Sequence, residues 1–323
     1  MLDRIIITQT NPPPITKKFR LPRYVRVKNP PRMILMERDK EILHQIYLFR
    51  FMTREQIERL LFVSANSEDR RTKTSICRKR LKFLYHHGYV DRIPTPVSPG
   101  SWAWQPVYRL AAKGAVVVAP MLGLAAKALN YWGKGFDRDH RLSDVSFLFL
   151  KHTLEINDFR IAVTQAAQRS GYQVEKWIDD TELKSKEMKD YVRVSGDHTG
   201  EARVAIVPDA YFILNLGNRR AHFFLELDRA TMSNRRWKTR ILAYRAYIER
   251  GKYQERYQTN SLRILTVTTT PERLANLKKT TEHAEGNNMF WFTTFPQVTP
   301  STVLSSPIWS VAQATVLSPL ITF

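Results

Sequence analysis

The stretch that decides the fold is IVPDAYFILNLGNRRAHFFLELDRATMSNRRWK, residues 206–238. Two apolar segments flank Gly217-Asn218, a dipeptide of the kind that forms two-residue hairpin turns. If these two residues form the turn, the numbers of opposed residues on the two strands sum to 435. The turn therefore predicts that Asp209 lies directly across from Glu226 on the neighbouring strand.

These acids lie beside nearly continuous apolar segments, AYFILNL and AHFFLEL, which are typical of strands covered on both faces. Because side chains alternate along a strand, Asp228 is expected on the same face as Glu226. Like charges on opposed strands repel unless a cation lies between them or one carboxyl is protonated. Closely spaced carboxylates suit Mg²⁺ or Mn²⁺, so the sequence predicts a divalent-metal site at Asp209, Glu226 and Asp228. The alternative is a solvent-facing acidic patch, against which the apolar flanks argue.

The composition indicates a polyanionic partner. The 323 residues include 51 Lys and Arg against 30 Asp and Glu, a net charge of +21, and nucleic acid is the commonest partner of so basic a chain. A merely basic surface is the alternative. The single cysteine, Cys77, excludes an internal disulfide and fits a reducing cytoplasm. No apolar run is long enough to cross a bilayer, so no membrane association is expected.

The N-terminal third has the order of a winged helix-turn-helix domain. Residues 1–32 are a basic, proline-rich arm, and residues 33–120 contain three helix patterns followed by two strand patterns around a Pro/Gly/Ser tip. Thr53 and Gln56 form a capping box that begins the second helix. In the third helix, Ile76, Leu81 and Leu84 are expected to face inward. Its acid-free basic face is expected to enter the major groove through Arg70, Arg71, Lys73, Arg78, Lys79 and Lys82.

The rest of the chain has the pattern of an α/β domain. We expect a link over residues 121–142, the domain over 143–300 and an apolar tail, packed as coil or as an edge strand, over 301–323. The polar segment DYVRVSGDHTGEAR, residues 190–203, is expected to be a loop. The helix from residue 235 to residue 250 carries six basic residues and one acid, which indicates phosphate contact, Arg235 and Arg236 included.

The motifs VPDA and FFLELD, with a lysine and a tyrosine following and a winged helix before them, resemble the replication-relaxation family of bacterial plasmids and mobile elements. The C-terminal half is also similar to the restriction-endonuclease-like superfamily, whose PD-(D/E)XK pattern is Pro-Asp, then a strand with Glu or Asp, any residue and Lys. The resemblance implies a mixed sheet, with Asp209 and Glu226 as catalytic metal ligands.

The sequence departs from that pattern where Asp228 occupies the position of the catalytic lysine. Some members carry the lysine on the next helix, where Lys238 stands. An upstream helix adds an acid in such enzymes, and here Asp158 is favoured, followed by Glu155, because Asp158 continues an apolar stripe and must be paired. On the same helix, His152 either orients a phosphate or caps the domain interface.

These features together indicate a DNA-binding protein with a winged helix and a restriction-endonuclease-like domain. That domain either nicks DNA with Mg²⁺ or Mn²⁺ or uses the same surface for binding. The first alternative is a non-enzymatic regulator of plasmid replication in which the acids are structural. The second is an assembly subunit of a nucleoprotein complex that uses the basic helix and the apolar tail for protein contacts. Lys238 discriminates between them, because catalysis requires its amine close to Asp209 and Glu226.

Overall fold

The computed structural model describes residues 21–22, 25–63, 66–93, 106–129, 147–196 and 200–322. Most of the expected basic arm, residues 1–32, lies outside this part of the chain. Within the described part of the arm, Arg26 donates hydrogen bonds of 2.8 Å to the carbonyl oxygens of Tyr85 and Val90, so this part packs on the N-terminal lobe.

The N-terminal lobe combines helices with a small antiparallel sheet. Its elements are α1 (Glu37–Phe49), β1 (Met52–Thr53), α2 (Arg54–Leu61), α3 (Ser67–His86), β2 (Val90–Ile93), β3 (Val107–Leu110) and α4 (Ala112–Met121). The three strands pair in the order β1-β3-β2. The predicted capping box of Thr53 and Gln56 is present at the start of α2. Gly88, with φ of 81°, follows α3 in the left-handed backbone region that glycine tolerates best.

One expectation for α3 is wrong. Ile76 is 38% exposed, whereas its neighbour Cys77 is fully buried together with Leu81 and Leu84. Cys77 precedes Leu81 by four residues and Leu84 by seven, so these three residues share one helix face and Ile76 lies beside it.

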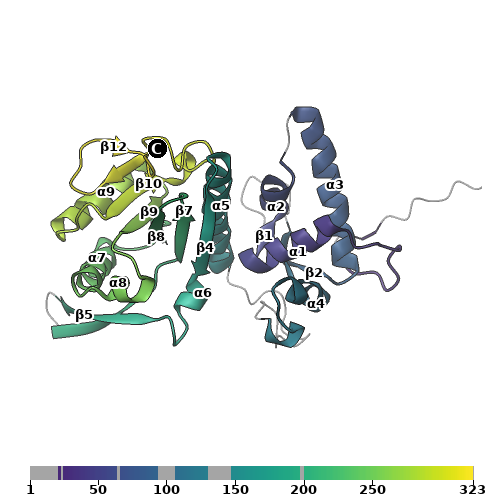
Figure 1. Cartoon of the computed structure of the whole chain (residues 1–323), viewed down its shortest axis with the longest axis horizontal. Coiled ribbons are helices and arrows are strands. Elements are labelled where there is room, and N and C mark those ends of the chain that lie inside the picture. Colours follow the sequence, from purple (N-terminus) through teal and green to yellow (C-terminus); the bar gives the residue numbers. More distant parts are fainter. Residues whose placement is uncertain are drawn as a thin grey trace, which may run out of the picture.

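The C-terminal lobe is a seven-stranded mixed sheet with helices on both faces (Figure 1). The strand order is β12-β11-β10-β9-β8-β7-β4, with β8, β9 and β10 parallel to one another. The bounds of these strands are β4 (Gln173–Asp179), β7 (Ala210–Asn215), β8 (Arg220–Leu227), β9 (Leu262–Thr268), β10 (Phe290–Thr294), β11 (Trp309–Val311) and β12 (Leu317–Ser318). The helices are α5 (Phe147–Arg169), α6 (Asp180–Leu183), α7 (Asn234–Glu249), α8 (Lys252–Tyr257) and α9 (Pro271–His283).

The hairpin of β7 and β8 has the register that its turn predicts. Opposed pairs run from Ala210 with Leu225 to Asn215 with Arg220, and every pair sums to 435. The segment over residues 190–203, expected to be a loop, instead forms the hairpin of β5 (Asp190–Gly196) and β6 (Gly200–Ile206). The loop expectation is therefore wrong, and this hairpin packs against α7.

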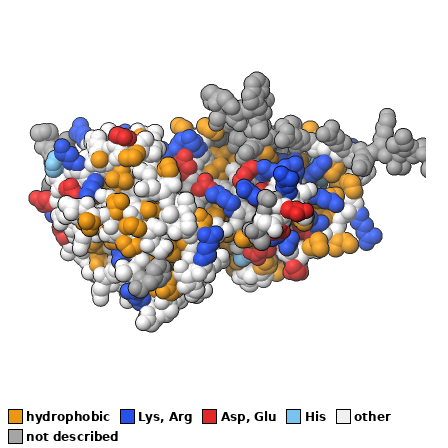
Figure 2. All heavy atoms as spheres, turned by 90° about the horizontal axis from the view of Figure 1, so that it is seen from above, with side chains coloured by type: hydrophobic (Ala, Val, Ile, Leu, Met, Phe, Trp, Pro, Cys, Tyr) orange, Lys and Arg blue, Asp and Glu red, His pale blue; other side chains and the backbone are white. Residues whose placement is uncertain are grey.

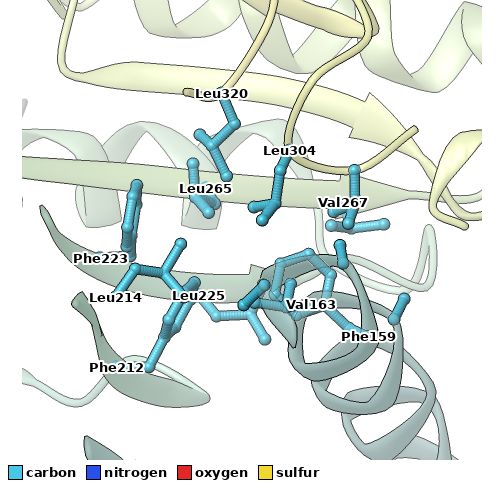
Figure 3. Packing of buried hydrophobic residues seen from close by; sticks show 14 of the residues in the cluster. Phe159, Val163, Phe212, Leu214, Phe223, Leu225, Leu265, Val267, Leu304 and Leu320 are labelled. Carbon is cyan, nitrogen blue, oxygen red and sulfur yellow. The ribbon is translucent and has the colours of Figure 1, made fainter. Parts of the chain in front are cut away.

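Each face of the large sheet is covered by a separate hydrophobic core. The first core lies between α5, the sheet and the C-terminal tail; Figure 3 shows Phe159 and Val163 of α5 packed toward Phe212 and Leu225, with Leu304 contributed by the tail. The second core places α7, α8 and α9 on the opposite face. The apolar tail is thus a structural part of the lobe, and it supplies the edge strand β12.

Helix α5 joins the two lobes. Asn157, which is buried, donates hydrogen bonds to the carbonyl oxygens of Phe49 at 3.1 Å and Phe51 at 2.6 Å. Arg160 donates to the carbonyl oxygen of Leu48 at 2.8 Å, and its guanidinium lies 4.2 Å from the centre of the Phe49 ring. The same helix therefore covers the sheet and holds the end of α1.

Candidate functional site

Asp209 lies where the ladder of β7 and β8 ends. The last paired residue of β7 is Ala210, and the backbone nitrogen of Asp209 donates to the carbonyl oxygen of Leu225 at 2.9 Å. Its carboxylate accepts a hydrogen bond from the backbone nitrogen of Leu227 at 2.7 Å and lies 3.0 Å from Nε2 of His152. Both carboxylate oxygens of Asp209 are therefore engaged by groups on β8 and α5.

Glu226 is buried on the face of β8 that α7 covers. Arg240 of α7 approaches its Oε1 atom through Nε at 2.8 Å and Nη2 at 2.6 Å, and the Tyr244 hydroxyl donates to the same oxygen. Burial raises the pKa of Glu226 to about 7, with the nearby charge of Asp209 adding to the rise and Arg240 opposing it. The repulsion expected between Asp209 and Glu226 is thus offset by a cation and by easier protonation.

His152 completes the group of charges around the two acids. Burial by itself lowers the pKa of His152, but its hydrogen bond to Asp209 and the charges of Asp209, Glu155 and Glu226 outweigh burial and raise the pKa above its ordinary value. His152 and Arg240 approach from opposite faces of the sheet, since α5 covers one face and α7 the other. We call the set of Asp209, Glu226, His152, Arg240 and Tyr244 the acid network.

Asp228 does not join the acid network. It forms a two-pronged ion pair with Arg273 of α9, with distances of 2.8 and 3.0 Å, and it accepts a hydrogen bond from Thr268 at 2.8 Å. Burial alone raises the pKa of Asp228, but the hydrogen bonds from Arg273 and Thr268 outweigh burial and hold the pKa below its ordinary value. Asp228 therefore links the end of β8 to α9.

The acids as arranged do not fit a divalent metal. The carboxylate of Asp209 is engaged by His152 and Leu227, that of Glu226 by Arg240 and Tyr244, and that of Asp228 by Arg273. Within the residues that the structure describes, no three His, Cys, Asp or Glu side chains are grouped so as to hold a metal ion. Hard divalent cations need several oxygen ligands directed at one point.

The remaining predicted catalytic residues lie in different surroundings. Asp158 is half-exposed at the contact between the lobes, where it pairs with Arg59 and accepts from Gln56 Nε2 at 3.0 Å. Glu155 lies 3.1 Å from Arg229. Lys238 is half-buried on α7, and Arg240 of the same helix contacts Glu226.

The predicted DNA-binding residues divide into exposed and engaged groups. On α3, the exposed members are Arg70, Arg71, Arg78 and Lys79. Lys73 pairs with Asp69 at 2.8 Å, and Lys82 is half-buried. On α7, Arg235 and Arg236 are exposed at the start of the helix. Figure 2 shows Lys and Arg side chains gathered over the N-terminal lobe on the face in view.

Arg240 is the site residue that the sequence reasoning missed as a partner of the acids. It was included only among the basic residues expected to contact phosphate. Its position carries a signal, because it lies three residues after Trp237 and four before Tyr244, both of which are buried on the inward stripe of α7. A charge beside a buried stripe requires a partner, and Glu226 supplies it.

No helix in the described segments has the length and hydropathy to cross a membrane. No curated protein matches the chain. Among solved structures, the restriction endonuclease FokI bound to DNA matches with a TM-score of 0.23 and 8% identity, over 80% of this chain and 43% of that chain. The family model for replication-relaxation matches residues 43–262, which is more than half of the chain. The chain therefore belongs to the replication-relaxation family.

Proposed function

We propose that this protein binds DNA during the replication of a plasmid or mobile element, and that its N-terminal lobe is a winged helix that docks on the duplex. The order of helices and strands in that lobe, with a three-stranded sheet ordered β1-β3-β2, supports a winged helix. Family membership supports the connection with replication.

The observation that carries the proposal is the exposed basic face of α3. Arg70, Arg71, Arg78 and Lys79 are exposed, and no acid occurs between residues 70 and 82. An exposed basic face of this kind attracts phosphates and releases the counterions that surround DNA. Helix α3 is the element that enters the major groove in this proposal.

The C-terminal lobe acts in this proposal as a non-cleaving platform. Asp209, Glu226 and Asp228 are each paired with a cationic or titratable partner within the protein, so in this proposal their carboxyl groups serve the fold and do not bind a metal. Pairing also reduces the repulsion that three free carboxylates would exert on DNA. The exposed Arg235 and Arg236 at the start of α7 extend the DNA-binding surface onto this lobe.

Fluorescence anisotropy with a labelled duplex at several salt concentrations tests the docking element. Replacing Arg78 and Lys79 with Ala should weaken binding and reduce the slope of log K against log salt by about 1.8, because each phosphate contact contributes about 0.9. Lys113→Ala removes an exposed charge from α4 as a control. Equal affinities and slopes for the double variant and the parent protein would exclude α3 as the docking element.

A second candidate function, metal-dependent nicking of DNA, is favoured by the ionisation of Glu226. Its pKa of about 7 means that the carboxyl changes charge close to neutral pH, and the contacts of Arg240 and Tyr244 all fall on Oε1. Nicking would require Arg240 to leave Glu226 so that the carboxylate becomes available. Metal-dependent nicking that Asp209→Asn abolishes would establish this second function.

A further inference from the structure

The hairpin of β5 and β6 meets α7 and α8 at a pocket of about 470 Å³. We call it the hairpin pocket. It lies on the C-terminal lobe at the far end of α7 from Arg235 and Arg236, and Figure 1 shows β5, α7 and α8 at one corner of that lobe. Five of the side chains that line it are basic: Lys189, Arg193, Arg203, Arg250 and Lys252.

Two of these cations are cross-strand neighbours on one face of the hairpin. Arg193 of β5 and Arg203 of β6 are directly opposed in the antiparallel register. Opposed residues have Cβ atoms about 4.5–5.5 Å apart, and like charges at that distance repel. Val192 and Val194, which flank Arg193 on its own strand, are buried against α7, so both arginines belong to the outer face of the hairpin.

The acids near the hairpin pocket do not offset this charge. Asp190 is held by Arg256, at 3.0 and 2.6 Å, and by the Tyr247 hydroxyl at 2.7 Å. Glu201 lies 3.6 Å from Arg193, but both side chains are more than half exposed, so this pair contributes little. The cationic charge of the hairpin pocket therefore exceeds what the neighbouring acids neutralise.

Tyr191 orders the cations around the pocket. The Arg203 guanidinium lies 3.8 Å from the centre of the Tyr191 ring, and the Lys189 amine lies 5.6 Å from it. Lys252 donates to the carbonyl oxygen of Tyr191 at 3.0 Å. Stacking on an aromatic ring fixes the plane of an arginine and leaves its edge N–H groups directed at a ligand.

We propose that the hairpin pocket binds a phosphate group of the DNA backbone, as a second contact in addition to that of α3. The inference rests on the proposed DNA-binding function. Phosphate is the anion whose oxygens match arginine in a planar, two-pronged geometry. Arg236 and Arg250, the residue that follows α7, are about 21 Å apart along the helix axis, which is the axial length of about six nucleotide steps, so one duplex can span both ends of the helix.

The test compares the parent protein with a double variant that carries both Arg193→Gln and Arg203→Gln. The probe is a fluorescein-labelled 30-base-pair duplex, titrated at several salt concentrations. Loss of two phosphate contacts should reduce the salt slope by about 1.8 and weaken binding about 60-fold at 0.1 M salt, since each contact contributes about 0.9 to the slope. The melting temperature should be unchanged or higher, because the variant removes a repulsive pair.

The matched control is a double variant that carries both Lys176→Gln and Lys279→Gln. It also removes two positive charges, from exposed positions on β4 and α9 outside the pocket. The control should lower the affinity much less than the pocket variant. Equal losses in the two variants would mean that only net charge matters, and this result would overturn the proposal.

Two further arms separate other ligands from the DNA backbone. If inorganic phosphate raises the melting temperature of the parent protein but not of the pocket variant, while DNA affinity is equal in both, the pocket binds free phosphate and the proposal is wrong. If the variant loses binding to polyglutamate but keeps its DNA affinity, the ligand is an acidic protein, and the proposal is again wrong. If the parent protein fails to bind the duplex at all, the proposed function itself fails.

Discussion

At the scale of single residues, the acid network shows how a strand pair accommodates like charges. Glu226 would be destabilised beside Asp209, but Arg240 lies against it, and its pKa rises to about 7. His152 performs the corresponding role for Asp209. Removing the cation alone would leave a buried carboxylate without a partner. This lowers the free energy of unfolding more than replacing both members of the pair does.

Glu226 predicts a specific dependence of stability on pH. Its pKa is raised from 4.5 to about 7 on folding, so the folded state binds the proton more tightly than the unfolded state. The contribution of this group is therefore fully present below pH 4.5 and is lost as the pH rises through 7, a change of about 3 kcal/mol in the free energy of unfolding.

Glu226→Gln should remove this dependence, because glutamine does not ionise and still accepts a hydrogen bond from Arg240. Urea unfolding at pH 4.5, 6 and 8 measures the free energy of unfolding of the parent protein and of the variant. The parent protein should lose stability relative to the variant as the pH rises. A difference between the two proteins that stays constant across this range would contradict the pKa assigned to Glu226.

The sequence predicted part of this site, for local reasons. The turn at Gly217-Asn218 fixes the register, so the six strand pairs from Ala210–Leu225 to Asn215–Arg220 followed from the sequence alone. The partner of Asp228 could not be predicted from the sequence, because Arg273 lies 45 residues away on α9 and only the tertiary fold brings the two residues together. Long-range pairing leaves no local periodic signal.

At the scale of elements, α5 contributes a polar contact between the lobes through Asp158, the acid that the sequence favoured as a catalytic residue. An acid that continues an apolar stripe needs a partner, and Asp158 is paired with Arg59 of α2. The sequence did not predict the hairpin of β5 and β6, because the segment is polar and contains glycine, which indicated a loop. The alternation of Val192 and Val194 with Tyr191 and Arg193 is nevertheless that of a strand with one buried face.

Two adjacent residues of α5 should differ in their contribution to stability. Asn157→Ala removes the side-chain hydrogen bonds to the carbonyl oxygens of Phe49 and Phe51 and should lower the free energy of unfolding by about 2 kcal/mol. Asp158→Ala, at a half-exposed position, should change it by less than about 1 kcal/mol. Urea unfolding followed by circular dichroism compares them. Equal effects of the two substitutions would contradict the assigned role of Asn157.

At the scale of the whole molecule, the C-terminal tail completes the sheet and the first core. Trp309 is fully buried and donates to the carbonyl oxygen of Val303 at 3.0 Å, and Leu320 is also fully buried. The sequence indicated packed coil or an edge strand for this segment, and both occur. A tail engaged in this way leaves fewer apolar residues for contacts with partner proteins.

Trp309→Ala should therefore destabilise the protein by about 3–5 kcal/mol through the cavity that it leaves. The matched substitution Leu317→Ala, at a residue that is 51% exposed, should change stability by less than about 0.5 kcal/mol. Thermal melting and urea unfolding of the full chain test both. A small effect of Trp309→Ala would show that the tail is dispensable for the core.

The central claim is that the protein binds DNA and that its C-terminal lobe does not cleave it, because side chains of the protein pair with Asp209, Glu226 and Asp228. The most direct measurement is the nicking of supercoiled plasmid by the parent protein at saturating concentration, with Mn²⁺ or Mg²⁺ and with chelator. We predict that the plasmid is bound but remains supercoiled under all three conditions. Metal-dependent nicking that Asp209→Asn abolishes, with DNA affinity intact, would contradict the claim.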